Sequence, residues 1–241
     1  MRMLTFAKRC TKEILRDPIN LAFGLGFPLV LLLLLSALQD NIPVDLFEID
    51  RLTPGITVFG LSFMTLFSAT LIAKYRESAF LQRLYTTPLR GIDFILGYML
   101  PVLPIALLQT VTCYLIAIPL GLTVRVNVVY AILGMIPVSI FYIALGLLCG
   151  SILGVKQVGG ICGALLTNLS AWLSGVWFDL NLVGGVFAKI ANVLPFVHAV
   201  KMEKALCMGD ITLAATHLLP VLVYGVVTTV VAVYLFLKIA A

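Results

Sequence analysis

Few side chains in this 241-residue chain have a type and spacing that could carry chemistry. The stretch nearest to a phosphate-binding loop, residues 150–156, lacks the required glycine–lysine spacing and the Ser or Thr after the lysine. His198 and His217 stand nineteen residues apart, without paired carboxylates or cysteines nearby. We therefore predict no catalytic residue, no metal and no cofactor held by this chain itself.

The elements that would position any site are six stretches without a charged residue: 18–39, 52–73, 94–124, 126–155, 157–178 and 211–237. About twenty helical residues, at about 1.5 Å each, cross a bilayer core about 30 Å thick. Hydrophobic residues make up 61% of the chain and charged residues 11%, which excludes an ordinary soluble domain. We predict an all-α polytopic membrane protein, one domain over 1–241, with spans at about 19–38, 54–73, 94–121, 128–153, 158–178 and 218–238.

The spans also bear on the source of energy. Carriers driven by protons or ions usually keep an ionisable residue deep in a span, because a buried charge is costly and is retained for use. None of the six stretches contains Asp, Glu, Lys or Arg. Energy for transport should therefore come from outside the membrane domain, and if ATP supplies it, another subunit binds the nucleotide.

The net charge of +5 is distributed as membrane topology requires. With a cytoplasmic N-terminus, the inner segments hold eleven Lys/Arg and four Asp/Glu, and the outer segments hold five Lys/Arg and seven Asp/Glu. This is the positive-inside bias, so we predict that both termini are cytoplasmic. The same bias explains the basic charge without a nucleic-acid partner.

Two segments outside the spans also have helical patterns. Residues 2–17 form an amphipathic helix, which we expect in the plane of the lipid headgroups, with an apolar face of Met3, Phe6, Ala7, Cys10 and Ile14. Residues 179–217 are too polar for a span and too apolar for a free loop. We expect two short helices there, broken at Pro195, that dip into the membrane from the outer face.

Glycines recur every fourth residue on two neighbouring spans: Gly146, Gly150 and Gly154, then Gly159 and Gly163. Such stripes let helix backbones approach closely. The contact lies within one subunit, at a seam between two copies, or along a conduit. Polar residues inside the spans, such as Asn168, are expected to form hydrogen bonds between helices, with a conduit role as the alternative.

The cytoplasmic segment at 74–88 has the form of a docking element. Phe80 and Leu84 stand one helical turn apart, as do Leu81 and Tyr85. The charged residues Arg76, Glu77 and Arg83 face elsewhere, and Pro88 ends the helix. An ordinary interfacial helix is the alternative.

These residues resemble the permease subunit of type-2 ABC exporters, which export drugs, polysaccharides and lipid-linked molecules. The resemblance covers almost the whole chain. Its most specific part is the stretch 76–89, continuing to Gly97, and a second match is Leu194-Pro195-Phe196. It implies a coupling helix at about 75–87 and outer re-entrant helices at about 184–208. The coupling residues would be Arg76, Glu77, Phe80, Leu81, Arg83, Leu84, Tyr85 and Pro88.

The resemblance also implies partners and a function. Two copies of a cytoplasmic ABC ATPase would bind ATP and Mg, and a second permease copy would complete a homodimer or a heterodimer among the membrane lipids. The complex would move a drug, peptide, lipid or glycan across the inner (plasma) membrane by alternating access, with multidrug or antibiotic resistance as one outcome. The alternative is a non-transporting scaffold or channel subunit.

Overall fold

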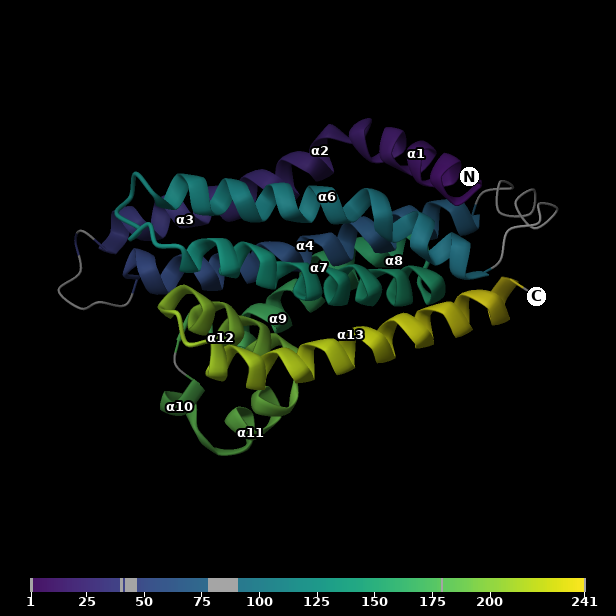
Figure 1. Ribbon diagram of the computed structural model, residues 1–241. Helices are drawn as coiled ribbons and strands as arrows, with labels where there is room; N and C mark the ends of the chain where they lie inside the picture. The colour runs from purple at the N-terminus through teal and green to yellow at the C-terminus, as the bar shows by residue number, and fades with distance from the viewer. Residues whose placement is uncertain (1, 40, 42–46, 78–90, 179, 241) are drawn as a thin grey trace.

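The computed structural model describes the chain except residues 1, 40, 42–46, 78–90, 179 and 241. The described residues form helices and contain no strand (Figure 1). In chain order the elements are α1 (Arg2–Leu15), α2 (Pro18–Leu21), η1 (Ala22–Gly26), α3 (Phe27–Gln39), α4 (Ile49–Glu77), α6 (Gly91–Ala117), α7 (Asn127–Ile152), α8 (Val155–Val158), η2 (Gly159–Leu166), α9 (Thr167–Ser174), α10 (Leu180–Val183), α11 (Gly185–Val193), α12 (Pro195–Met208) and α13 (Ile211–Ala240), where η1 and η2 are π-helical.

Helix α4 lies at the centre of the bundle. Nearly every residue between Leu52 and Tyr75 is buried, because α4 packs along both α6 and α7. Several of its hydroxyl groups donate to carbonyls of the same helix: Ser68 Oγ donates to the Met64 carbonyl at 2.7 Å, and Thr57 Oγ1 to the Thr53 carbonyl at 2.7 Å. Internal hydrogen bonding of this kind lets a helix carry polar side chains where water is absent. α7 packs in turn along α13.

The exterior of the bundle is apolar. On α13, Val226 is 62% exposed and Tyr234 63%, and α3 presents Val30, Leu33 and Leu34 outward. A soluble protein would bury such a surface, whereas lipid tails solvate it. The chain is therefore a multi-pass membrane protein.

Among the described residues, five helical stretches are long and apolar enough to cross a membrane: Pro18–Gln39, Ile49–Glu77, Ile95–Ala117, Asn127–Ile152 and Ile211–Phe236. The chain from Val155 to Ser174 is also helical, through α8, η2 and α9, but it is not among the five. Its polar residues Gln157, Thr167 and Asn168 lower its mean hydropathy. The count of six spans therefore stays a prediction.

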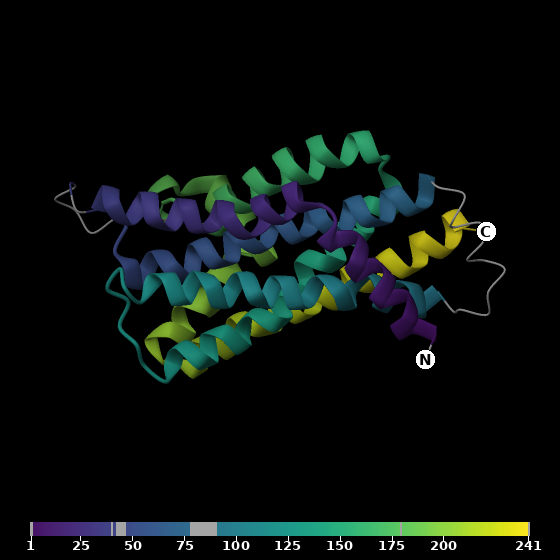
Figure 2. The ribbon, with the colours of Figure 1, turned by 90° about the horizontal axis from the view of Figure 1, so that it is seen from above.

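The bundle has two distinct ends (Figures 1 and 2). Both termini, α1 and the last turn of α4 lie at one end, which we call the α1 end. α10, α11, α12 and the first turn of α4 lie toward the other, which we call the α12 end. The candidate sites divide between these two ends.

Candidate functional site

At the α1 end, Arg76 binds the end of a neighbouring helix. Its Nη1 donates to the carbonyl oxygens of Gly150, at 3.1 Å, and Ser151, and its Nη2 donates to the Ile152 carbonyl at 3.3 Å. These carbonyls belong to the last turn of α7, where helical acceptors lack partners within the helix. A cation there also complements the negative end of the helix dipole.

The next residue, Glu77, binds the following helix. Its Oε1 accepts the backbone N–H of Val155, the first residue of α8, at 2.8 Å. A Cβ added to Gly154 would stand 3.0 Å from this carboxylate oxygen, so the glycine leaves room for the contact. Arg76 and Glu77 thus hold both sides of the turn between α7 and α8, and we call this pair the α4 clamp.

The α4 clamp lies next to the segment with the clearest docking pattern. Six of the eight predicted coupling residues lie outside the described residues: Phe80, Leu81, Arg83, Leu84, Tyr85 and Pro88. The two that are described, Arg76 and Glu77, contact backbone groups of α7 and α8. The clamp therefore holds the end of α4 at Glu77, directly before residue 78.

Helix α1 packs against both elements that flank residues 78–90. Phe6 makes edge contacts with Tyr75 of α4 and Tyr98 of α6, with ring centroids 6.1 and 5.0 Å apart. A Cβ on Gly97 would overlap the Phe6 ring, so only glycine permits this approach. Phe6, Cys10 and Ile14 are buried in this contact. We expected α1 in the plane of the lipid headgroups, but its apolar face packs largely on protein.

Polar contacts add to this packing. Lys74 Nζ lies 3.3 Å from Asp17 Oδ2, which joins the last turns of α4 to the start of α2. Tyr75 donates its hydroxyl hydrogen to Glu13. Burial raises the pKa of the Cys10 thiol to about 12, so this cysteine is an inert packing group. The described residues of the α1 end are held by many contacts, and none of these contacts forms a catalytic or metal-binding group.

The glycine stripe of α7 contacts the backbone of α4. A Cβ on Gly150 would lie 2.5 Å from the Ala69 carbonyl oxygen, and one on Gly146 would overlap the Thr65 carbonyl. Thr65 Oγ1 donates to the Tyr142 carbonyl at 3.0 Å across the same contact. These two glycines therefore serve packing within the subunit.

The remaining stripe residues behave differently. No atom lies within 4 Å of a Cβ built on Gly159, and Gly163 meets only the flexible Leu66 side chain. Asn168 is exposed and donates to Ala164 of its own helix at 2.8 Å. This face of η2 and α9 makes no close helix contact within the described residues, although its spacing matches that of α7.

At the α12 end, the Leu194-Pro195-Phe196 motif separates two helices. α11 ends at Val193, Leu194 is extended, and Pro195 is the first residue of α12, where its missing N–H costs nothing. Phe196 is buried against Phe141, with ring centroids 5.9 Å apart. The motif thus anchors α12 on α7.

A buried carboxyl group lies on α12 that the sequence pattern did not single out. Glu203 is fully buried, and its Oε1 accepts the Tyr114 hydroxyl of α6 at 2.5 Å. Its Oε2 has no hydrogen-bond partner among the residues that the structure describes. Burial raises the pKa of Glu203 to about 8, against the lowering effect of the tyrosine. Helical spacing was the available signal, since Glu203 follows Phe196, Ala199 and Val200 along the buried face.

The two histidines come together in the structure. The Nδ1 atoms of His198 and His217 lie 2.9 Å apart, and His198 Nε2 lies 3.0 Å from the Asn192 carbonyl. Burial lowers the pKa of His198, which favours its neutral form. Among the described residues, no group of three or more His, Cys, Asp or Glu gathers as metal ligands would. The pair therefore acts as a link between α12 and α13.

The nearest approach to a phosphate loop is also a packing element, since residues 150–156 form the end of α7 and the start of α8 rather than a strand-to-helix turn.

The family model of the ABC-2 type transporter matches residues 1–203 of the 241. The chain belongs to this family. No curated protein matches it. Its ABC-2 membrane domain is the permease component of a membrane transporter.

Membership agrees with the geometry at the α1 end. An ABC-2 permease normally works with an ABC ATPase. The α4 clamp and α1 together support the two ends of the segment that resembles a coupling helix. The family match ends at residue 203, so it covers the α12 helix only in part and leaves out α13.

Proposed function

We propose that this chain is the membrane permease of an ATP-driven exporter, coupled to a separate ABC ATPase through residues 75–87. The ATPase subunits would bind ATP and Mg, and the permease would move a hydrophobic or amphipathic molecule outward by alternating access. The α4 clamp is the observation that carries this proposal. It fixes the departure point of the docking segment to α4, the most buried helix of the bundle.

The clamp provides a mechanical route for coupling. Force applied to residues 78–90 reaches α4 directly through Glu77, and reaches α7 and α8 through the side chains of Arg76 and Glu77. α4 packs tightly on α7 at Gly146 and Gly150, so these helices would move together. A rigid joint of this kind is what hinge or shear motion of packed helices requires.

The proposed orientation places the α1 end in the cytoplasm. Both termini lie at this end of the bundle, which agrees with an even number of crossings (Figures 1 and 2). The bias of Lys and Arg toward the same segments supports the inner (plasma) membrane topology. The exposed face with Gly159 and Asn168 offers a surface for a second permease copy.

The test is to separate docking from insertion. We expect Phe80→Ala and Leu84→Asp to weaken ATPase binding, because buried anchors often contribute about 2 kcal/mol or more to an interface. Binding should fall by well over about tenfold, since about 1.4 kcal/mol corresponds to one decade. The measurement is ATP hydrolysis and export in liposomes that hold the full chain and its co-purified ATPase.

Leu4→Ala is the matched control, since Leu4 is an exposed apolar residue of α1 at the same end. Its variant should bind and export as the unmodified chain does. If Phe80→Ala and Leu84→Asp both export normally, residues 75–87 are an ordinary interfacial helix and not a coupling element. Flux through the chain alone, without ATPase, would instead identify a channel.

A further inference from the structure

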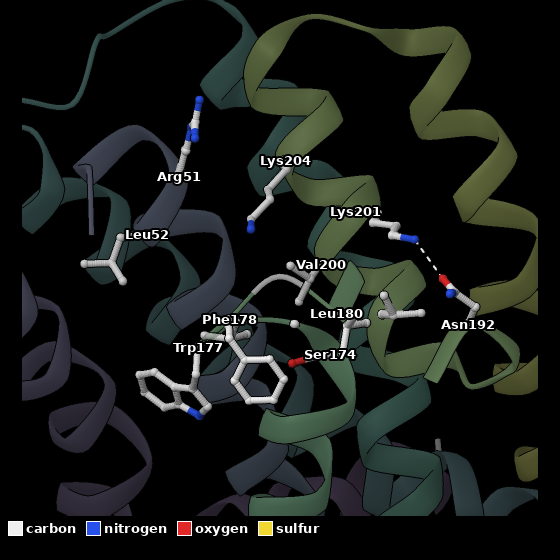
Figure 3. A pocket seen from close by; sticks show the side chains of 13 residues that line it. Arg51, Leu52, Ser174, Trp177, Phe178, Leu180, Asn192, Val200, Lys201 and Lys204 are labelled. Carbon is white, nitrogen blue, oxygen red and sulfur yellow. Dashed lines mark hydrogen bonds between the residues drawn. The ribbon is translucent and has the colours of Figure 1, made fainter. Parts of the chain in front are cut away.

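A cavity of about 420 Å³ opens at the α12 end, between the start of α4, the end of α9 and α12 (Figure 3). Of the 13 described residues that line it, three are cations and none is acidic. The cations are Arg51 of α4 and Lys201 and Lys204 of α12. Three positive charges around one hollow are unusual on a bundle with so few charged residues.

Apart from Ser174 and Asn192, the other side chains of the wall are apolar. Leu52, Val197 and Val200 line the cavity and are buried, with 4%, 1% and 2% of their surfaces exposed. Trp177 and Phe178 form an aromatic side, and Figure 3 shows the ammonium group of Lys204 directed into the space above them, with Arg51 and Lys201 on either side. The cavity thus joins a cationic rim to an apolar floor.

Two of the three cations, Lys201 and Arg51, retain donors for a ligand. Lys201 Nζ donates to Asn192 Oδ1 at 2.8 Å, and an ammonium group has two further hydrogens. Arg51 Nε lies 3.6 Å from Glu48, and both side chains are more than half exposed. An exposed ion pair of this kind is weak, and the guanidinium has five N–H donors. Both residues can therefore turn to an anion without a large loss.

We propose that this cavity binds a phosphate-bearing amphiphile, with the phosphate at Arg51, Lys201 and Lys204 and the adjoining chain against Trp177 and Phe178. Arg and Lys together suit phosphate oxygens, and aromatic side chains suit the apolar part next to them. A bilayer lipid and a transported amphiphile share this chemistry. Asp179, between two lining residues in sequence, lies outside the described residues.

The chain supplies its own probe of this cavity. It contains two tryptophans, and Trp172 is exposed and outside the cavity while Trp177 lines it. In a Trp172→Phe background, Trp177 fluorescence reports on the cavity. The full chain in phosphatidylcholine nanodiscs, without ATPase, is titrated with dodecyl phosphate, with dodecyl maltoside and with inorganic phosphate.

We expect dodecyl phosphate to change Trp177 emission and the other two probes to have little effect. Lys201→Gln with Lys204→Gln should weaken dodecyl phosphate binding at least about tenfold, which is about 1.4 kcal/mol. Arg51→Gln alone should weaken it less. Lys189→Gln, which removes an exposed lysine of α11 outside the cavity, should leave the affinity unchanged. An equal response to dodecyl maltoside, or an equal loss with Lys189→Gln, would overturn the proposal.

A second arm identifies the source of the amphiphile. If a bilayer lipid occupies the cavity, phosphatidylglycerol in the nanodisc should compete with dodecyl phosphate, and if it takes a transported amphiphile, the affinity should not depend on this lipid. An equal response to inorganic phosphate would show that the apolar chain does not contribute to binding, and would overturn the proposal of an amphiphile. A transported amphiphile as the source rests on the proposed export function. Binding to the cavity is measured without nucleotide, so it does not depend on ATP coupling. Failure here with intact ATP coupling, or the reverse, separates the two proposals.

Discussion

Charged side chains have different surroundings at the two ends of the bundle. At the α1 end, Arg76 and Glu77 bond to backbone groups of α7 and α8, and Lys74 pairs with Asp17. At the α12 end, Arg51, Lys201 and Lys204 surround a cavity of about 420 Å³. The first end uses charge to hold helices together, and the second keeps it accessible. We infer that the α1 end transmits movement and the α12 end meets a ligand.

Two glutamates show the same contrast in a single residue type. Glu77 is exposed and accepts a backbone N–H, whereas Glu203 is fully buried with one oxygen on Tyr114 and the other without a partner in the described part of the chain. Burial disfavours a charged carboxylate, so Glu203, with its pKa raised to about 8, is mainly a neutral acid at pH 7. Position in the fold, not residue type, therefore decides that Glu203 keeps its proton.

The largest effect should come from the contact that joins the two ends. Gly146→Leu would drive a side chain into the Thr65 backbone of α4, and overpacking a tight contact costs about 1–3 kcal/mol, occasionally more. We expect loss of monodisperse protein on detergent gel filtration. Gly26→Leu is the matched control, because a Cβ built on Gly26 meets nothing within 4 Å beyond its own helix backbone. Equal losses in both variants would show that the loss does not come from the contact between α4 and α7.

A smaller effect should follow from Glu203→Gln at the α12 end. The folded pKa of about 8 exceeds the ordinary value of 4.5, so the folded state holds the proton more tightly. The associated stability is complete below the lower value and is lost as pH rises through the higher one. The midpoint of thermal unfolding in detergent should therefore fall with pH between 5 and 8.5 more steeply than in Glu203→Gln. Parallel profiles would show that this carboxyl does not titrate with folding.

The smallest effect should come from Arg76→Gln at the α1 end. The guanidinium is part-buried, and its hydrogen bonds to the last carbonyls of α7 contribute about 1–2 kcal/mol together. We expect a lower unfolding midpoint and faster proteolysis between α7 and α8. Arg125→Gln removes an exposed arginine at the other end and should change neither. An unchanged midpoint in Arg76→Gln would mean that the clamp is not structural.

Much of the helical framework was predictable from the sequence, because apolar runs and their breaks are local properties. The uncharged stretches indicate the long helices, and Pro195 marks where α12 begins. Glu203 was assigned to an outer segment by its charge, although helical spacing places it on the same face as Phe196 and Val200. Local polarity and helical periodicity conflict there, and packing on α6 and α7 decides in favour of periodicity.

The sequence by itself determined a membrane-embedded helical chain, since bilayer solvation depends only on how many apolar residues follow one another. It also contained the docking pattern at 74–88 and the glycine stripes. Only the tertiary structure decided that Gly146 and Gly150 meet the α4 backbone while Gly159 meets nothing, and that Arg76 and Glu77 bond to α7 and α8. The physical reason is that spacing along a helix identifies a face, whereas the rotation and neighbours of that helix identify what the face contacts.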